Sequence, residues 1–329
     1  MSIGRGSEHM SVVEEIEAVT RRVAEQVGPS VVAVGRGCGV VLAEGQVLTN
    51  AHNLHSAEVA VGFLDGRRSV GSVGGVDVDG DIAVVLVDTG GAPPLSWSQA
   101  ARAADGAAAA GPGTVVLALA NPGGRGLRVT LGQVSATGRA FRGPRGRRIR
   151  GSLEHTAPMV KGSSGGPVVS PDGELLGLNT NRLSEGFYLA LPADAELRRR
   201  VEALAAGTTP YRPHLGVALA PGRAARHLRQ AVGLPPRDGL LVRAVEDDSP
   251  AAEAGIATGD LLVAIGDRPL VRIDDLHEVL DAIVLHGPGD TAELAVQIVR
   301  GAQELAATVT FTVTFTADQV PEDGPTPPG

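Results

Sequence analysis

The chain has 329 residues, about enough for two domains of ordinary size, and 43% of them are hydrophobic, so a packed core is expected and global disorder is excluded. The net charge of −8 at pH 7 excludes a general nucleic-acid binder, because such proteins need excess positive charge to neutralise phosphates. The single cysteine, Cys38, excludes an internal disulfide framework and any metal site built from several cysteines.

The start of the chain favours a short helix. Met1–Ser11 is polar, and the apolar segment typical of a secretory signal does not follow it. No apolar run reaches the ~18 residues that a membrane span needs. Residues 12–27 then place valine and isoleucine at helical spacing up to Gly28-Pro29. We therefore expect an N-terminal segment, residues 1–28, that contains a short helix.

The next region consists of short apolar runs separated by glycines. The runs are 31–34, 39–43, 46–49, 57–64, 82–87, 114–120, 128–136, 166–170 and 174–180. Runs of this length and spacing predict a β-barrel or β-sandwich rather than alternating strands and helices. A helical pattern at residues 193–206 closes the region, and we assign a first domain to residues 29–207.

The rest of the chain has a different composition. Residues 208–212 have the composition of a short linker, and residues 213–316 mix strand patterns with two predicted helices near 223–232 and 274–284. The tail, residues 317–329, is acidic and rich in proline, which predicts disorder.

A serine-containing turn carries the strongest chemical signal. Gly162–Pro167 reads G-S-S-G-G-P and leads into an apolar strand. Glycines beside a serine permit a tight turn in which backbone N–H groups converge, and such donors stabilise the oxyanion of acyl transfer. A serine between glycines is by itself ordinary turn chemistry, but the complete segment favours a nucleophile. Its spacing to Gly-Gly-Pro selects Ser164 over Ser163.

A serine nucleophile needs a base and a group that orients the base. His52 comes directly after the strand run that ends at Leu48-Thr49, in the segment Thr49-Asn50-Ala51-His52. Asp81 directly precedes the apolar run Ile82–Val85. His55 and Asp79 are alternatives. Each of these residues alone is compatible with a surface position or a turn. The order His, Asp, Ser within one β-rich domain favours a Ser-His-Asp hydrolase.

These motifs resemble a known family. T-N-A-H, G-D-I-A-V and G-S-S-G-G-P resemble the catalytic segments of trypsin-like serine proteases, and the likeness to the HtrA (Deg) family extends over about residues 28–316. The resemblance implies a mainly β protein, with a chymotrypsin-like double Greek-key β-barrel and a catalytic cleft between the barrels.

The resemblance also implies roles for individual residues. His52 is the general base, Asp81 orients its imidazole, and Ser164 attacks the peptide carbonyl. The backbone N–H groups of Gly162 and Ser164 form the oxyanion hole.

The substrate pocket is inferred from the same resemblance. Glu174–Thr180 is similar to the strand that lines the primary specificity pocket. Met159 and the absence of an acidic residue near the expected pocket suggest a preference for a small or medium apolar residue before the cut. The expected pocket residues are Met159, Leu178, Asn179 and Thr180. The chain departs from the family at Ser163, where asparagine is usual, and in the segment 155–161. At Cys38 the family commonly has serine, and we interpret the cysteine as a small buried residue.

The second region resembles a PDZ domain, an α+β fold. The segments that carry the likeness are Ser249–Ala251, Ala254–Ile256 and Gly259–Ile265. Such domains bind an extended chain by β-augmentation and hold its terminal carboxylate in a backbone nest. The matching loop assigns the nest to Leu215, Gly216 and Val217. The facing helix carries Leu276, Val279, Leu280 and Ile283, and we interpret most of this stripe as core rather than groove.

Residues 139–150 contain six arginines in an otherwise acidic chain. A solvated loop is the simplest interpretation. The alternative is that this loop transmits ligand binding from the PDZ domain to the active site, because its position matches a family loop with that role.

Together these features predict an ATP-independent serine endopeptidase that cleaves unfolded or damaged proteins in protein quality control. The PDZ domain would bind polypeptide C-termini for recruitment or activation. The alternative is a non-proteolytic chaperone or PDZ-based binding protein with an inactive or resting protease domain. We expect no cofactor and no nucleic-acid partner. We also expect no metal, because His52 and His55 lack a third ligand segment. The family resemblance suggests an extracytoplasmic location and a possible homotrimer.

Overall fold

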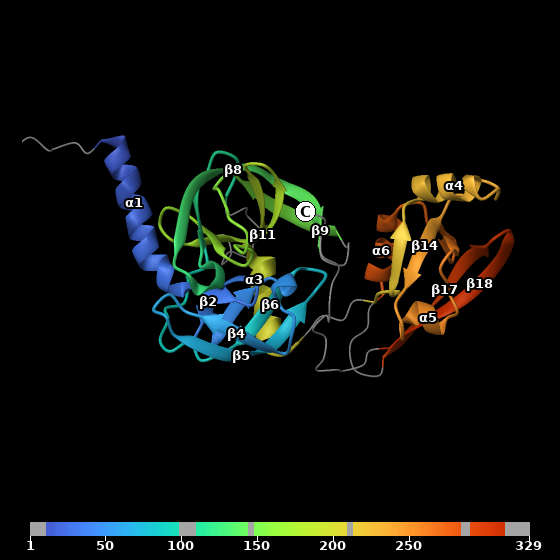
Figure 1. Cartoon of the computed structure of the whole chain (residues 1–329), viewed down its shortest axis with the longest axis horizontal. Coiled ribbons are helices and arrows are strands. Elements are labelled where there is room, and N and C mark those ends of the chain that lie inside the picture. The colour runs from blue at the N-terminus through green and yellow to red at the C-terminus, as the bar shows by residue number, and fades with distance from the viewer. Residues whose placement is uncertain (1–10, 99–109, 144–147, 209–212, 284–289, 313–329) are drawn as a thin grey trace, which may run out of the picture. The chain divides into compact units, whose positions relative to one another are not determined.

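The computed structural model describes residues 11–98, 110–143, 148–208, 213–283 and 290–312. These residues fall into two compact units that divide between residues 209 and 210 (Figure 1). The predicted disordered tail and most of the predicted linker lie outside the described residues. No described helix is long and apolar enough to cross a membrane.

The first unit contains two closed β-barrels, which confirms the expected fold class. In the first barrel the strand order is β1-β2-β3-β6-β5-β4, and each neighbouring pair is antiparallel. Its strands are β1 (Val31–Val34), β2 (Gly37–Ala43), β3 (Gln46–Thr49), β4 (Glu58–Gly62), β5 (Arg68–Asp77) and β6 (Ile82–Leu86).

The second barrel has the strand order β10-β11-β12-β9-β8-β7. Its strands are β7 (Val115–Ala120), β8 (Arg128–Arg142), β9 (Arg148–His155), β10 (Pro167–Val169), β11 (Leu175–Ser184) and β12 (Phe187–Pro192). Short 3-10 helices lie between the elements of this unit: η1 (Gly28–Ser30) precedes β1, η2 (Ala51–Asn53) lies between β3 and β4, and η3 (Pro122–Gly124) lies between β7 and β8.

All nine predicted strand runs overlap a strand, but β5, β9 and β12 were not predicted. β5 is rich in glycine because its neighbours lie very close. A Cβ at Gly71 would come within 2.7 Å of the Val85 side chain, and one at Gly75 within 2.5 Å of the Leu204 carbonyl. The strand β8 continues to Arg142, so part of the arginine-rich segment belongs to the β8–β9 hairpin, and residues 144–147 lie outside the described residues.

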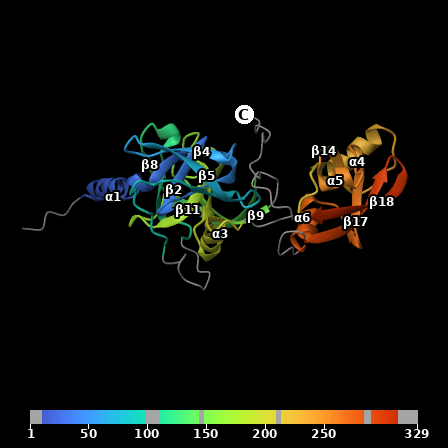
Figure 2. The same ribbon diagram turned by 90° about the horizontal axis from the view of Figure 1, so that it is seen from below.

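Two helices cover this unit at the predicted places. α1 (Val12–Val27) follows the N-cap Ser11, whose hydroxyl accepts from the Glu14 N–H in a capping box. Its last turns pack on the barrels through Val23 and Val27, and its exposed first turns extend away from them (Figures 1 and 2). α3 (Ala195–Ala205) begins at Asp194, whose side chain accepts from the Leu197 N–H.

One aliphatic core joins both barrels to these helices. It includes Val23 and Val27 from α1, Leu48 and Ile82 from the first barrel, and other members from the second barrel and α3. Those members are Leu117, Leu119, Ile149, Val169, Leu175, Leu178, Leu191, Leu197, Val201 and Leu204. Because barrel contacts of this kind fix each strand end, the loops that leave the strands are held in defined positions.

The described part of the second unit is one sheet with three helices. The strand order is β13-β14-β15-β17-β18, and β16 pairs with β15. The strands are β13 (Val217–Ala220), β14 (Leu240–Val245), β15 (Leu261–Ile265), β16 (Arg268–Pro269), β17 (Thr291–Arg300) and β18 (Gln303–Thr312). The helices are α4 (Gly222–Ala231), α5 (Pro250–Glu253) and α6 (Ile273–Asp281). On α6, Leu276 and Leu280 are buried in the core, as the interpretation of the stripe expected. Val279 of α6 and Ile283, just after its end, pack against this core.

Candidate active site

The pairing of β3 with β6 brings His52 and Asp81 together. His52 lies in η2, just after β3, and Asp81 directly precedes β6. The two strands are antiparallel, and Thr49 at the end of β3 lies opposite Ala83 near the start of β6. The sequence places both residues beside strand ends, and the register then puts them at the same edge of the barrel.

The two side chains form a close hydrogen-bonded pair. His52 Nδ1 lies 2.8 Å from Asp81 Oδ1 and 2.9 Å from Oδ2, and the His52 backbone N–H donates to Oδ1 at 3.2 Å. The Asp81 side chain is 1% exposed and that of His52 is 32% exposed. Because the carboxylate accepts a hydrogen bond from Nδ1, neutral His52 keeps Nε2 as a base.

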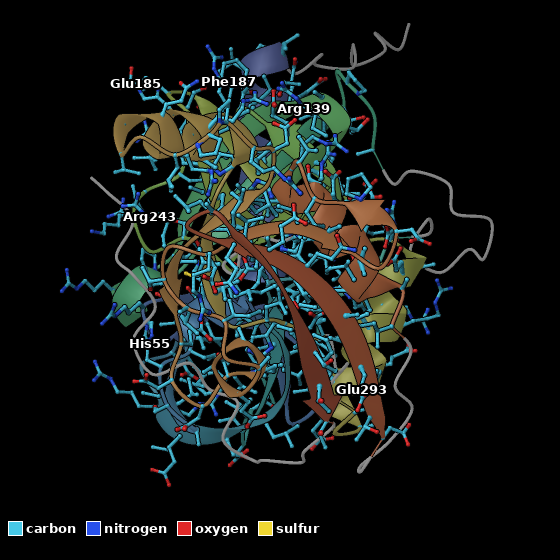
Figure 3. The ribbon with its side chains drawn as sticks, turned by 90° about the vertical axis from the view of Figure 1, so that its right-hand side faces the viewer. His55, Arg139, Glu185, Phe187, Arg243 and Glu293 are labelled. Atoms are coloured by element: carbon cyan, nitrogen blue, oxygen red, sulfur yellow. The ribbon has the colours of Figure 1, made fainter. Side chains whose placement is uncertain are left out.

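The alternative residues occupy different places. His55 is exposed on the surface, where Figure 3 labels it. Asp79 is buried in the turn before Asp81. The structure thus pairs His52 with Asp81.

The turn that presents Asp81 is stabilised from two sides. Asp81 has φ = +54°, a left-handed conformation that is uncommon outside glycine. Asp77 Oδ1 accepts from the Gly80 N–H at 2.8 Å, and Arg200 of α3 donates to Asp77 Oδ2 at 2.7 Å. A Cβ at position 80 would lie 1.7 Å from Nη2 of Arg200 and 2.6 Å from Oδ2 of Asp77, so a larger residue there would displace this ion pair.

The Ser164 turn is as tight as its glycines predict. Gly162 and Gly165 both have φ = +85°. A Cβ at Gly165 would lie 2.0 Å from the Cys38 carbonyl oxygen, and one at Gly166 would lie 2.3 Å from the Leu119 carbonyl oxygen. Only glycine permits this approach to the backbones of β2 and β7.

Ser164 is held by groups from both barrels. Its carbonyl accepts from the Cys38 N–H at 2.8 Å and from Asn53 Nδ2 at 3.0 Å, both in the first barrel. Its hydroxyl donates to the Thr180 carbonyl at 2.7 Å, in β11 of the second barrel. Proton transfer to His52 therefore requires this hydrogen bond to exchange for one to Nε2.

Thr180 connects the predicted residues. Its hydroxyl donates to Asp81 Oδ2 at 2.6 Å, while its carbonyl accepts from Ser164. The sequence placed Thr180 in the substrate pocket, and nothing in its local pattern indicated a contact with a carboxylate 99 positions away. Asn50 and Asn53 were missed for the same reason. The Asn50 side chain donates to the Asp81 carbonyl at 2.9 Å.

The other predicted pocket residues differ in exposure. Leu178 is fully buried in the core, and Met159 is half-buried. Asn179 is buried, and its Oδ1 lies 2.8 Å from Nε2 of His155. His155 stacks on Tyr188, and burial lowers the pKa of its imidazole although the hydrogen bond that Nε2 donates to Asn179 Oδ1 opposes that shift.

In the second unit the predicted carboxylate nest precedes the edge strand β13. Gly216 has φ = +73°, and its carbonyl accepts from the Glu246 N–H at 2.8 Å. The Leu215 side chain is buried, and Val217 begins β13 opposite Val245. A Cβ at Gly216 would lie 2.2 Å from Cβ of Ser249, so only glycine fits this turn.

Within the described ranges no group of three or more histidine, cysteine or acidic side chains is arranged to hold a metal ion.

Two family models match the chain. Residues 37–178 match the trypsin-like peptidase domain, and residues 213–311 match the PDZ domain. The serine endoprotease DegS of Salmonella typhimurium is 31% identical over 289 residues, which are 83% of this chain and 76% of that protein. The putative serine protease HhoB of Synechocystis is 32% identical over 280 residues, which are 81% of this chain and 64% of that protein.

Solved structures agree with this similarity. The serine endoprotease from Yersinia pestis superposes with a TM-score of 0.57 at 27% identity, over 89% of this chain and 97% of that one. The HtrA-type protease AlgW, solved with a decapeptide, has a TM-score of 0.58 at 23% identity, over 90% and 99% of the two chains. This second likeness supports the fold alone.

Proposed function

Because the chain belongs to the HtrA (Deg) family of trypsin-like serine proteases, we propose that it hydrolyses peptide bonds with Ser164 as nucleophile, His52 as general base and Asp81 as the group that orients the base. The observation that carries this assignment is the double role of Thr180, which binds the carboxylate of Asp81 through its hydroxyl and the hydroxyl of Ser164 through its carbonyl.

The first chemical step is attack on the substrate carbonyl. The Ser164 hydroxyl leaves the Thr180 carbonyl and donates to Nε2 of His52, which takes the proton as the oxygen attacks. The buried carboxylate of Asp81 stabilises the imidazolium that forms, because it accepts from Nδ1 at 2.8 Å. His52 then returns the proton to the leaving amine, and water repeats the sequence to release the acyl group.

The oxyanion of the tetrahedral intermediate needs preorganised donors. We assign this role to the backbone N–H groups of Gly162 and Ser164. The left-handed conformation of Gly162 and the hydrogen bonds to the Ser164 carbonyl support this assignment, because they restrict the turn on which both donors lie.

The proposed substrates are unfolded or damaged polypeptides, cleaved without ATP after a small or medium apolar residue. Met159, Asn179 and Thr180 would border the pocket for that residue, and the buried Leu178 would support it from beneath. Only an extended segment can reach a serine held in a turn between two barrels, which favours unfolded chains over folded ones.

The PDZ domain is proposed to bind polypeptide C-termini at Leu215, Gly216 and Val217. β13 is an edge strand, so it can pair with an added chain, and the turn before it is the place for a terminal carboxylate. This binding would recruit substrates or activate the protease domain.

Cleavage of casein tests the catalytic assignment. Ser164→Ala and His52→Ala are expected to fold normally and to lose activity by several powers of ten, because members of the triad act as a unit. Ser163→Ala is the matched control, since its hydroxyl is buried one position away and is expected to leave the nucleophile in place. Undiminished cleavage by Ser164→Ala would refute the proposal.

A further inference from the structure

Cys38 was interpreted from the sequence as a small buried residue, and it is fully buried in β2. Its thiol also makes two polar contacts. Sγ lies 3.2 Å from the Gly162 carbonyl oxygen and 3.2 Å from the Asn121 backbone nitrogen. Burial raises the pKa of the thiol to about 12, so it stays protonated at neutral pH and can donate its hydrogen.

The partners of the thiol determine the direction of each hydrogen bond. The Gly162 carbonyl is an acceptor only, so the S–H group donates to it. The Asn121 N–H is a donor only, so it donates to a sulfur lone pair. Cys38 thus joins the turn of the nucleophile to the segment after β7, and both hydrogen bonds use the one side chain.

The backbone of Cys38 contacts the same turn. Its N–H donates to the Ser164 carbonyl at 2.8 Å, and its own carbonyl accepts from the Thr49 hydroxyl at 2.7 Å. The carbonyls of Gly162 and Ser164 are therefore both bound by Cys38, one through the thiol and one through the backbone. These are the two residues whose N–H groups form the proposed oxyanion hole.

The thiol contact matters because Gly162 is a glycine. A glycine at φ = +85° can exchange its adjacent peptide planes between orientations at small cost. A hydrogen bond to the Gly162 carbonyl fixes the plane that follows it, and so restricts the turn. The Ser164 carbonyl needs no such help from the thiol, since backbone and Asn53 donors hold it.

We propose that Cys38 is a positioning residue for the oxyanion hole, whose thiol hydrogen bond to the Gly162 carbonyl holds the nucleophile turn in its reactive conformation. This inference rests on the proposed function and deepens it. A sulfur hydrogen bond is weak, so the effect is smaller than the loss of an oxyanion donor itself.

The test compares Cys38→Ser with Cys38→Ala. Serine and alanine leave similar space, but only the serine hydroxyl can both donate to Gly162 and accept from Asn121. We expect Cys38→Ala to lower kcat for a peptide substrate about 10-fold with KM changed less than about twofold, and Cys38→Ser to restore kcat to within about threefold of the parent. If Cys38 only fills space, Cys38→Ser has no higher kcat than Cys38→Ala.

The thermal denaturation of each Cys38 variant is also measured in the Ser164→Ala background, which prevents self-cleavage. If Cys38→Ala fails to fold, the near-isosteric pair Cys38→Thr and Cys38→Val replaces it under the same logic. Equal kcat in the hydroxyl and apolar variants, or a loss confined to KM, would overturn the inference. If the Cys38 variants give such a result and Ser164→Ala is inactive, only this inference fails and the proposed function stands. If Ser164→Ala is active, the proposed function itself is refuted.

Discussion

The turn before Asp81 makes a quantitative prediction about Arg200. This arginine reaches from α3 to Asp77, whose carboxylate also accepts from the Gly80 N–H. The Asp77 side chain is 2% exposed and that of Arg200 is 25% exposed, so the pair is largely shielded from water. Arg200→Ala removes this ion pair, and the turn that holds Asp81 in its left-handed conformation loses one of its supports.

The expected cost follows from the burial of the pair. Removal of one partner from a fully buried ion pair costs about 3–5 kcal/mol. Because water reaches part of the Arg200 guanidinium, we expect less, about 2 kcal/mol, within the range for a hydrogen bond to a charged group. Arg198 offers a matched control in the same helix. Both side chains of its ion pair with Glu202 are exposed, so the pair contributes about 0.3–0.5 kcal/mol to stability.

Thermal denaturation in the Ser164→Ala background measures the difference. Arg200→Ala should lower Tm by about 4–8 °C and Arg198→Ala by no more than about 2 °C, at about 2–4 °C per kcal/mol for a unit of this size. In the active protein, well below Tm, Arg200→Ala should lower kcat about 10-fold because Asp81 no longer orients His52 uniformly. Identical behaviour of the two variants in both assays would refute the reasoning.

Three further predictions concern the same chain. Thr180→Val removes the hydroxyl that donates to Asp81 and should lower kcat about 10- to 100-fold, while Thr180→Ser should retain most of it; equal rates for the two variants in peptide turnover would contradict the role. His155 has a lowered pKa in the folded state, so the unfolded chain binds a proton first as pH falls below ~6.5, and stability should rise with pH in that range by at most about 1.4 kcal/mol per unit. Urea denaturation at several pH values measures the free energy of unfolding as a function of pH, and this free energy should rise less steeply with pH in His155→Gln than in the parent. An unchanged dependence on pH would exclude His155 as the cause. Calorimetry should show weaker binding of an amidated C-terminal peptide than of its free acid, and equal affinities would rule out a carboxylate nest at Gly216.

The sequence predicted the parts of this protein that depend on local pattern. The continuous apolar runs Val31–Val34 and Ile82–Leu86, the capped helix α1 and the glycines around Ser164 each carry their own signal. The strand β5 has no such signal, because its glycines are required by contacts with Val85 and Leu204 that are distant in sequence.

The candidate site divides in the same way. His52, Asp81 and Ser164 stand in recognisable segments, and the register of β3 with β6 brings the first two together. The contacts of Thr180 with Asp81 and of Cys38 with Gly162 join residues 99 and 124 positions apart. Such contacts arise only when the two barrels close on each other, so no pattern within one segment could predict them.

Labelling with a fluorophosphonate probe tests the central claim most directly. The probe reacts with a serine hydroxyl only where a base activates it and donors stabilise the developing charge. We predict that one probe molecule attaches to Ser164, as located by mass spectrometry of the digested protein, and that His52→Ala reacts slower by several powers of ten. Labelling at Ser163, or at the same rate without His52, would contradict the assignment of this site.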